Sequence, residues 1–115
     1  MSDKQIDRFI ACLLKIREYT GHKISMDLML QYLYTASEGE RSFVDVMDWM
    51  DWSAVKVSRD ISSLGELRYQ GKGYNTGYQL LYTEEHPTNR AMKNIFLTDK
   101  GKKLKKELKK ILDAK

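Results

Sequence analysis

Short polar and basic side chains recur along the segment from Ser53 to Leu67, which is predicted to be a helix. Its apolar stripe consists of Ala54, Val57, Ile61 and Leu64. The opposite face and its flanks hold Lys56, Ser58, Arg59, Ser62 and Ser63, and Ser53 is the expected N-cap. Side chains of these types hydrogen-bond base edges and phosphates, so this face is a candidate contact surface for nucleic acid.

A second basic group accompanies a predicted β-hairpin. Strands are expected at Tyr78–Thr83 and Asn94–Leu97, with a polar tip over Glu84–Ala91. The basic and amide residues of this region are Asn89, Arg90, Lys93, Lys100 and Lys102. An arginine near a hairpin tip can bind phosphate or enter the narrow minor groove. We therefore expect these residues to contact the DNA backbone or the minor groove.

The remaining elements supply the frame for these two groups. Helical spacing of apolar residues predicts helices at Asp3–Tyr19, Ser25–Ser37, Phe43–Met50 and from Asp99 onward. Residues Gly71–Gly77 are expected to form a flexible loop. The pair formed by Phe43–Met50 and the next helix has the separation of a helix-turn-helix. The predicted fold is α+β but mostly α. It is one winged helix-turn-helix domain over residues 1–115, with extra N- and C-terminal helices at 3–19 and 99–114.

Length and charge agree with that prediction. The 115 residues suffice for one domain, and the formal net charge is +4 with a pI near 9.1. Residues 99–115 contain eight lysines and three acidic residues, which gives +5, so the other 98 residues sum to −1. The positive charge is concentrated at one end of the chain, which favours a nucleic-acid partner.

The terminal helices carry more apolar surface than one small domain needs to cover. The first helix has Ile6, Phe9, Ile10 and Leu13, and the last has Leu104, Leu108, Ile111 and Leu112. Left bare, two such stripes would expose an apolar patch that is uncommon on a monomer. We therefore expect these residues to form a homodimer interface.

Other chemistries find little support. Cys12 lies in an apolar helical pattern and is expected to be a buried, reduced thiol. Neither His22 nor His86 forms a recognisable nucleophile–base pair, so no catalytic residue and no enzyme activity are predicted. Residues Gly71–Gly73 lack the spacing of a phosphate-binding loop, and no cofactor is expected.

Asp45, Asp48 and Asp51 have no His or Cys beside them and are expected to be a solvated face, with no metal bound. Trp49 and Trp52 flank the predicted turn, where packing is expected. No apolar run is long enough for a membrane span, and no signal peptide is evident, so a cytoplasmic protein is expected, associated with the nucleoid when bound to DNA.

Two motifs resemble the MarR family of winged-helix transcriptional regulators. The segment Val57–Leu64 is similar to the recognition-helix pattern of that family, and Leu97–Gly101 is similar to its LT-x-x-G junction between wing and last helix. Asn89–Arg90 falls where the family has an Asp-x-Arg wing motif, here without the Asp. The resemblance spans about residues 25–112. It implies a DNA-binding regulator whose terminal helices build a dimer.

The leading hypothesis is a non-enzymatic, sequence-specific binder of double-stranded DNA that acts as a homodimeric transcriptional regulator or repressor. The alternative is a winged-helix module that binds a protein of the transcription or replication machinery. The acidic aspartates and the modest net charge favour that alternative. Salt separates the two hypotheses, because binding to DNA weakens steeply as salt rises.

Overall fold

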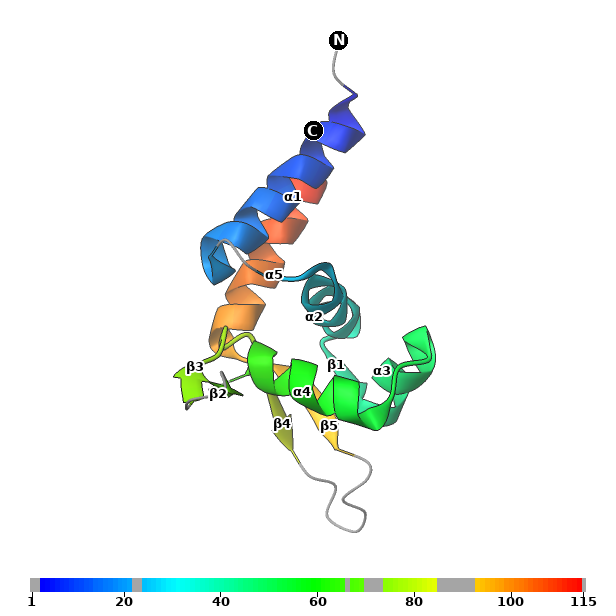
Figure 1. Cartoon of the computed structure of the whole chain (residues 1–115). Coiled ribbons are helices and arrows are strands. Elements are labelled where there is room, and N and C mark those ends of the chain that lie inside the picture. Colours follow the sequence, from blue (N-terminus) through cyan, green and yellow to red (C-terminus); the bar gives the residue numbers. More distant parts are fainter. Residues whose placement is uncertain (1–2, 22–23, 66, 70–73, 85–92, 115) are drawn as a thin grey trace.

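A computed structural model describes residues 3–21, 24–65, 67–69, 74–84 and 93–114. Its helices are α1 (Lys4–Thr20), α2 (Met26–Glu38), α3 (Phe43–Met50), α4 (Ala54–Leu64) and α5 (Asp99–Leu112). Its strands are β1 (Glu40–Ser42), β2 (Leu67–Tyr69), β3 (Tyr74–Thr76), β4 (Leu81–Glu84) and β5 (Asn94–Leu97). Figure 1 shows α2, α3 and α4 gathered around the small sheet, while α1 and α5 extend away from it.

Side-chain caps explain where the helices begin. The hydroxyl oxygens of Ser25, Ser42 and Ser53 accept hydrogen bonds from backbone N–H groups of the first turns of α2, α3 and α4. Gly39 ends α2 with a φ of +88°, in the left-handed region that a glycine adopts without strain. The predicted starts of these helices are confirmed.

The winged-helix fold is confirmed by the sheet. Its three antiparallel strands have the order β1-β5-β4, with Arg41 opposite Ile95 and Thr83 opposite Ile95 on the other side. β4 and β5 are the two strands of the wing, and β1 lies between α2 and α3 in the chain. Strand β1 was not predicted, because Glu40–Ser42 lacks strand composition and becomes a strand only by pairing with β5.

The end of α4 differs from the prediction. The helix ends at Leu64, not at Leu67, because backbone N–H groups of a later segment take its last carbonyls. Tyr78 N donates to Ser63 O, and Leu80 N donates to Leu64 O at 2.8 Å. The backbone N–H groups of Tyr78–Leu80 therefore bond to this helix end, and the strand predicted at Tyr78–Thr83 begins only at Leu81.

A second pair of strands starts at the predicted end of the helix and extends into the predicted loop. β2 and β3 pair antiparallel, with Leu67 opposite Thr76 and Tyr69 opposite Tyr74. Both the end of the predicted helix and the predicted loop Gly71–Gly77 are therefore corrected in part, since Tyr74–Thr76 is a strand.

One core joins all five helices to the sheet. Its buried side chains are Cys12, Ile16, Tyr32, Ala36, Val46, Val57, Ile61, Leu64, Leu80, Leu81, Ile95, Leu97, Leu104 and Leu108. In β5 the buried residues Ile95 and Leu97 alternate with more exposed ones, as expected for a strand with one face on the core. Ala54 was predicted to point inward but is exposed at the start of α4.

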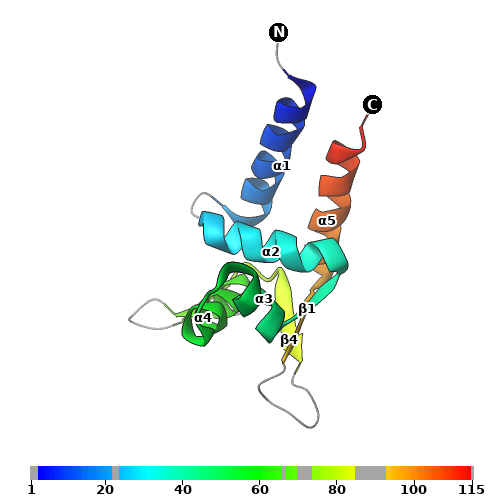
Figure 2. The ribbon, with the colours of Figure 1, turned by 90° about the vertical axis from the view of Figure 1, so that its right-hand side faces the viewer.

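Helices α1 and α5 pack side by side and project from the domain as a pair, which we call the helical arm (Figure 2). At its base the Tyr19 hydroxyl donates to a carboxylate oxygen of Glu107 at 2.5 Å. This hydrogen bond raises the pKa of Tyr19 to about 12. The arm accounts for the elongated shape, which measures 52 × 33 × 27 Å.

A close backbone contact fixes where the arm begins. Thr98 caps α5 by accepting from Gly101 N, and its hydroxyl donates to Gln79 O at 2.6 Å. A Cβ at Gly101 would lie 2.1 Å from Leu80 O. Gly101 O in turn accepts a hydrogen bond of 2.6 Å from the buried Tyr32 hydroxyl. The last helix, α2 and the segment before the wing therefore meet at one glycine.

Replacing this glycine tests the contact. We expect Gly101→Ala to lower the free energy of unfolding by about 3 kcal/mol, because the Cβ meets backbone, which cannot rotate away as a side chain can. Chemical denaturation followed by circular dichroism measures the change. Lys102→Ala, at the exposed neighbouring position, is the control and should shift stability by less than about 0.5 kcal/mol. Equal effects of the two substitutions would contradict the proposed role of the contact.

Candidate nucleic-acid interface

The outer face of α4 and the residue before β5, the second strand of the wing, border one open hollow. Ser58, Arg59 and Ser62 of α4 line it together with Lys93, which directly precedes β5. Lys93 is held there because its carbonyl accepts a hydrogen bond of 2.8 Å from Phe43 N, at the start of α3. Four of the predicted contact residues, from two distant parts of the sequence, thus share one concave surface.

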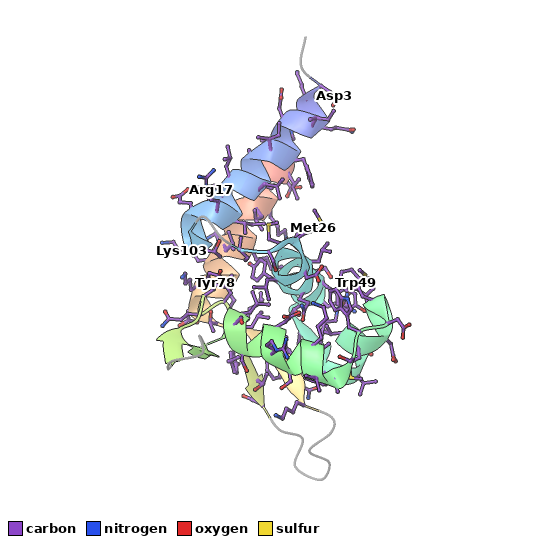
Figure 3. The ribbon with its side chains drawn as sticks, in the orientation of Figure 1. Asp3, Arg17, Met26, Trp49, Tyr78 and Lys103 are labelled. Carbon is purple, nitrogen blue, oxygen red and sulfur yellow. The ribbon has the colours of Figure 1, made fainter. Side chains whose placement is uncertain are left out.

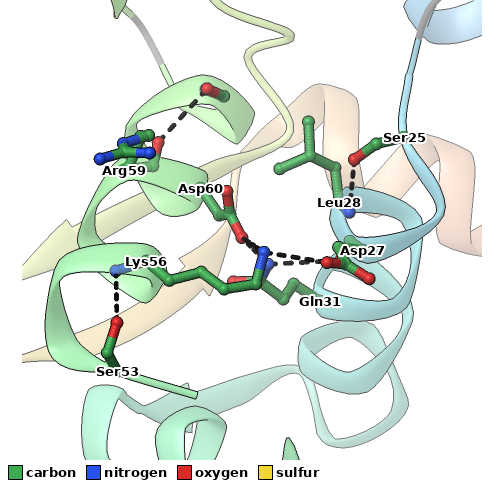
Figure 4. A network of polar contacts seen from close by, with 9 residues as sticks. Ser25, Asp27, Leu28, Gln31, Ser53, Lys56, Arg59 and Asp60 are labelled. Atoms are coloured by element: carbon green, nitrogen blue, oxygen red, sulfur yellow. Dashed lines mark hydrogen bonds and ion pairs between the residues drawn. The ribbon is translucent and has the colours of Figure 1, made fainter.

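Arg59 is available for an outside partner. Its side chain is exposed, and within the described part of the chain no carboxylate forms an ion pair with it. Figure 4 shows its guanidinium on the opposite side of α4 from the acidic groups near Lys56. Two nearby serines also serve the helix itself: Ser63 donates its hydroxyl to Arg59 O, and Ser53 caps Lys56 N. The charged group best placed for an outside partner on this face is therefore Arg59.

Lys56 is engaged inside the protein. Its amine lies 2.9 Å from a carboxylate oxygen of Asp27 on α2 and 3.0 Å from one of Asp60 on α4. Hydrogen bonds to Asp27 and then to Asp60 raise the pKa of Lys56 above its ordinary value. The structure thus places this predicted contact residue in a bridge between α2 and α4 (Figure 4).

The bridge continues to a fully buried amide. Gln31 of α2 donates from Nε2 to the same Asp60 oxygen at 2.6 Å. Gln31 Oε1 and Thr35 Oγ1, one turn apart on α2, are buried and have no hydrogen-bond partner within the described residues. A buried polar group without a partner is destabilising. Without the Asp60 carboxylate, Gln31 Nε2 would lose this hydrogen bond as well, so Asp60 has a structural role.

The other predicted wing and phosphate contacts are dispersed. Lys100 donates to Tyr78 O at 2.9 Å, and Lys102 is exposed on the first turn of α5. Both lie in the first turn of α5, which follows β5 in the chain; Figure 3 labels their neighbours Tyr78 and Lys103. Asn89 and Arg90 lie outside the described residues.

The predicted dimer residues divide into two groups. Ile6, Phe9 and Ile10, together with Leu14 of the same apolar stripe, each expose between 49% and 61% of their surface. Leu13 and Ile111 are half-buried, and Leu112 is exposed. Leu104 and Leu108, by contrast, belong to the core of the chain itself. These two leucines are covered by their own chain, so the apolar surface open to a second copy lies mainly on α1 and at the end of α5.

The remaining candidate groups have structural surroundings. Cys12 is a free, buried cysteine, and burial raises the pKa of its thiol. Within the described ranges, no group of three His, Cys, Asp or Glu residues is arranged to hold a metal ion. Trp49 stacks on Tyr34 at 4.0 Å and meets Trp52 edge-on, as expected for packing around the turn. None of the helices that the structure describes has the length and hydropathy to cross a bilayer.

Three apolar residues in the hollow were not predicted as contact residues. Phe43, Ala54 and Val55 line it beside Arg59 and Lys93. Helical spacing already places Val55 on the polar face of α4, and this was the available signal. Phe43 could not be assigned from spacing, because it reaches the hollow, beside Lys93, only through the pairing of β1 with β5.

The two carboxylates that bind Lys56 should differ in importance. Asp60 exposes 15% of its side chain and also holds the buried Gln31 amide, whereas Asp27 exposes 46%. We expect Asp60→Ala to destabilise the protein by about 2 kcal/mol, because it removes the hydrogen-bond acceptor of a buried amide. Asp27→Ala should have an effect of about 0.5 kcal/mol, as for an exposed ion pair. Denaturation midpoints measure both, and the interpretation fails if Asp27→Ala is the more damaging.

Comparison with known proteins identifies the architecture. No family model and no curated protein sequence matches the chain. Among solved structures, reduced AbfR bound to DNA aligns with a TM-score of 0.63 at 14% identity, over 95% of this chain and 72% of that one. A MarR-like transcriptional regulator of Thermotoga maritima aligns with 0.60 at 18% identity, over 99% and 77%. BpsR of Bordetella bronchiseptica, whose DNA binding is regulated by 6-hydroxynicotinic acid, aligns with 0.56 at 17% identity, over 91% and 72%. The chain has the winged-helix fold of these MarR-like structures.

Proposed function

We propose that the chain is a MarR-type transcriptional regulator that binds double-stranded DNA in a sequence-specific manner. The observation that carries the proposal is the hollow in which Ser58, Arg59 and Ser62 of α4 face outward beside Lys93. A helix with exposed hydroxyl and guanidinium groups fits the major groove. The fold supports the proposal, since a solved structure of the same architecture, AbfR, is bound to DNA.

In this proposal α4 reads bases and the wing binds the backbone or the minor groove. Arg59 is the principal base-reading residue, and Ser58 and Ser62 assist it. Lys93, Lys102, Asn89 and Arg90 contact phosphates or the minor groove, the last two from the hairpin tip that the sequence predicts. Lys56 and Lys100 hold α4 and α5 in place through their internal contacts.

The working unit is proposed to be a homodimer formed through the helical arm. Its apolar surface on α1 is open, and Leu112 at the far end of α5 adds to it. A two-fold dimer would bury this surface and present two recognition helices about 34 Å apart, one turn of DNA. The dimer is proposed to act as a repressor.

A protein-interaction module remains the second candidate, favoured by the exposed apolar residues of α3. Val44, Trp49 and Met50 are each partly exposed, and the solvated residues Asp45, Asp48 and Asp51 lie among them in the sequence. A mobility shift against pooled random duplexes at two salt concentrations separates the candidates. Selective duplex binding that weakens steeply with salt supports the regulator, whereas no duplex binding at low salt leaves the protein-binding module.

Arg59→Ala should weaken binding to the selected duplex by about 1–3 kcal/mol while leaving the circular dichroism spectrum unchanged, because the exposed side chain forms no ion pair with any described residue. Fluorescence anisotropy measures the affinity. Arg8→Ala, on α1, removes the same charge far from α4 and is the matched control. If both variants lose affinity equally, net charge rather than α4 determines binding.

Phe9→Asp should convert the dimer to monomers at micromolar concentration, because it puts a charge at the centre of the exposed surface of α1. Light scattering measures the mass. Val44→Asp introduces the same charge on α3, at another partly exposed apolar position, and should leave the dimer intact. A monomeric unmodified protein, or a dimeric Phe9→Asp variant, would exclude the arm as the interface.

A further inference from the structure

Val55 is an apolar residue whose side chain contributes little to the packing of the domain. It exposes 67% of its surface, on the outer face of α4 and one turn from Arg59. Valine is a modest helix former, because its branched side chain loses rotamer freedom in a helix. Its neighbour Val57, by contrast, is completely buried. Neither packing nor helix propensity therefore accounts for a valine at position 55.

The surroundings of Val55 combine apolar and positive groups. Phe43 and Ala54 border the same hollow and extend its apolar surface, while Arg59 and Lys93 supply positive charge. An apolar surface alone would suit many partners. Two cations within the same hollow match it to a partner that is both negatively charged and locally apolar.

The major groove of DNA offers that combination. The 5-methyl group of thymine is the apolar group that base pairs present there, and guanine offers two acceptors to an arginine. Val55 and Arg59 are four residues apart on one helix, which corresponds to about 6 Å along its axis. Successive bases along a strand lie about 3.4 Å apart, so two such side chains reach bases about two steps apart.

We propose that Val55, with Ala54 beside it, reads the methyl group of a thymine located about two base pairs from the guanine bound by Arg59. The inference rests on the proposed function and adds a base-specific preference to it. Val55 is then a specificity-determining residue, and its contact is with the C5 methyl group rather than with a hydrogen-bonding edge.

Replacing thymine by uracil isolates this contact, because uracil pairs identically and lacks only the methyl group. The full chain is first used to select a duplex from a random pool. Each thymine of the selected site is then replaced singly by uracil, and affinity is measured by anisotropy. At one thymine per half-site, uracil should weaken binding by the unmodified protein about fourfold, the effect of burying one methyl group.

The variant Val55→Ala carries the decisive comparison. It should bind the thymine duplex about as weakly as the unmodified protein binds the uracil duplex, and its own loss on uracil substitution should fall below about 1.5-fold. Val44→Ala shortens a less exposed valine of α3 outside the lining of the hollow, and its fourfold loss on uracil should persist.

Three outcomes would overturn the inference. In the first, no uracil position affects the unmodified protein, although it selects a duplex. In the second, Val55→Ala keeps the full fourfold loss. Either result removes the methyl contact and leaves the proposed DNA binding intact. In the third, no duplex is selected at low salt, and the proposed function fails together with the inference.

Discussion

The arrangement of the domain depends on the close approach of Gly101 to the carbonyl of Leu80. This contact is possible only without a side chain, since a Cβ would lie 2.1 Å from the carbonyl oxygen. The same carbonyl accepts a hydrogen bond from Thr98 N, and Gly101 O accepts one from Tyr32. The contact therefore sets the direction in which α5 leaves the sheet, and α1 follows because it packs along α5. Helical arm and wing are thereby held in one relative orientation.

Helix α4 is held from two sides, and this determines which of its cations remain available. At its C-terminus the segment Tyr78–Leu80 takes its last carbonyls, so the helix end is fixed to the base of the wing. Along its flank Lys56 and Asp60 tie it to α2 through Asp27 and the buried Gln31. Lys56 cannot both hold α4 against α2 and bind a DNA phosphate fully, because the phosphate would compete with the carboxylates of Asp27 and Asp60. Lys56 thus positions the helix, while Arg59, on the opposite side, is available for the proposed recognition of DNA.

Local features of the sequence were predictable because short-range physics determines them. Serine caps, the glycine at the end of α2 and the alternation in β5 all follow from neighbouring residues. The features that the sequence did not predict depend on contacts with segments distant in the chain. Glu40–Ser42 becomes a strand only because β5 lies beside it, and Leu67 leaves the helix because a later segment caps it earlier. For the site, spacing identified the outer face of α4. It could not show that Lys56 reaches across to α2, or that Leu108 is covered by its own chain.

The proposed DNA binding depends on the arm, because one copy of the chain presents few free cations and the arm is proposed to join two copies. Each phosphate neutralised contributes about 0.9 to the slope of log affinity against log salt, so a copy with few phosphate contacts binds weakly. With Lys56 and Lys100 engaged internally, the hollow of one copy presents Arg59 and Lys93. Two linked copies bind DNA more tightly than one, because binding of the first copy raises the effective concentration of the second at its half-site. This gain requires that both copies reach their half-sites at the same time. That condition requires a fixed angle between arm and α4. In the proposed dimer, the glycine junction contributes no side chain to the DNA contacts, yet it is as necessary for binding as Arg59, the proposed base-reading residue.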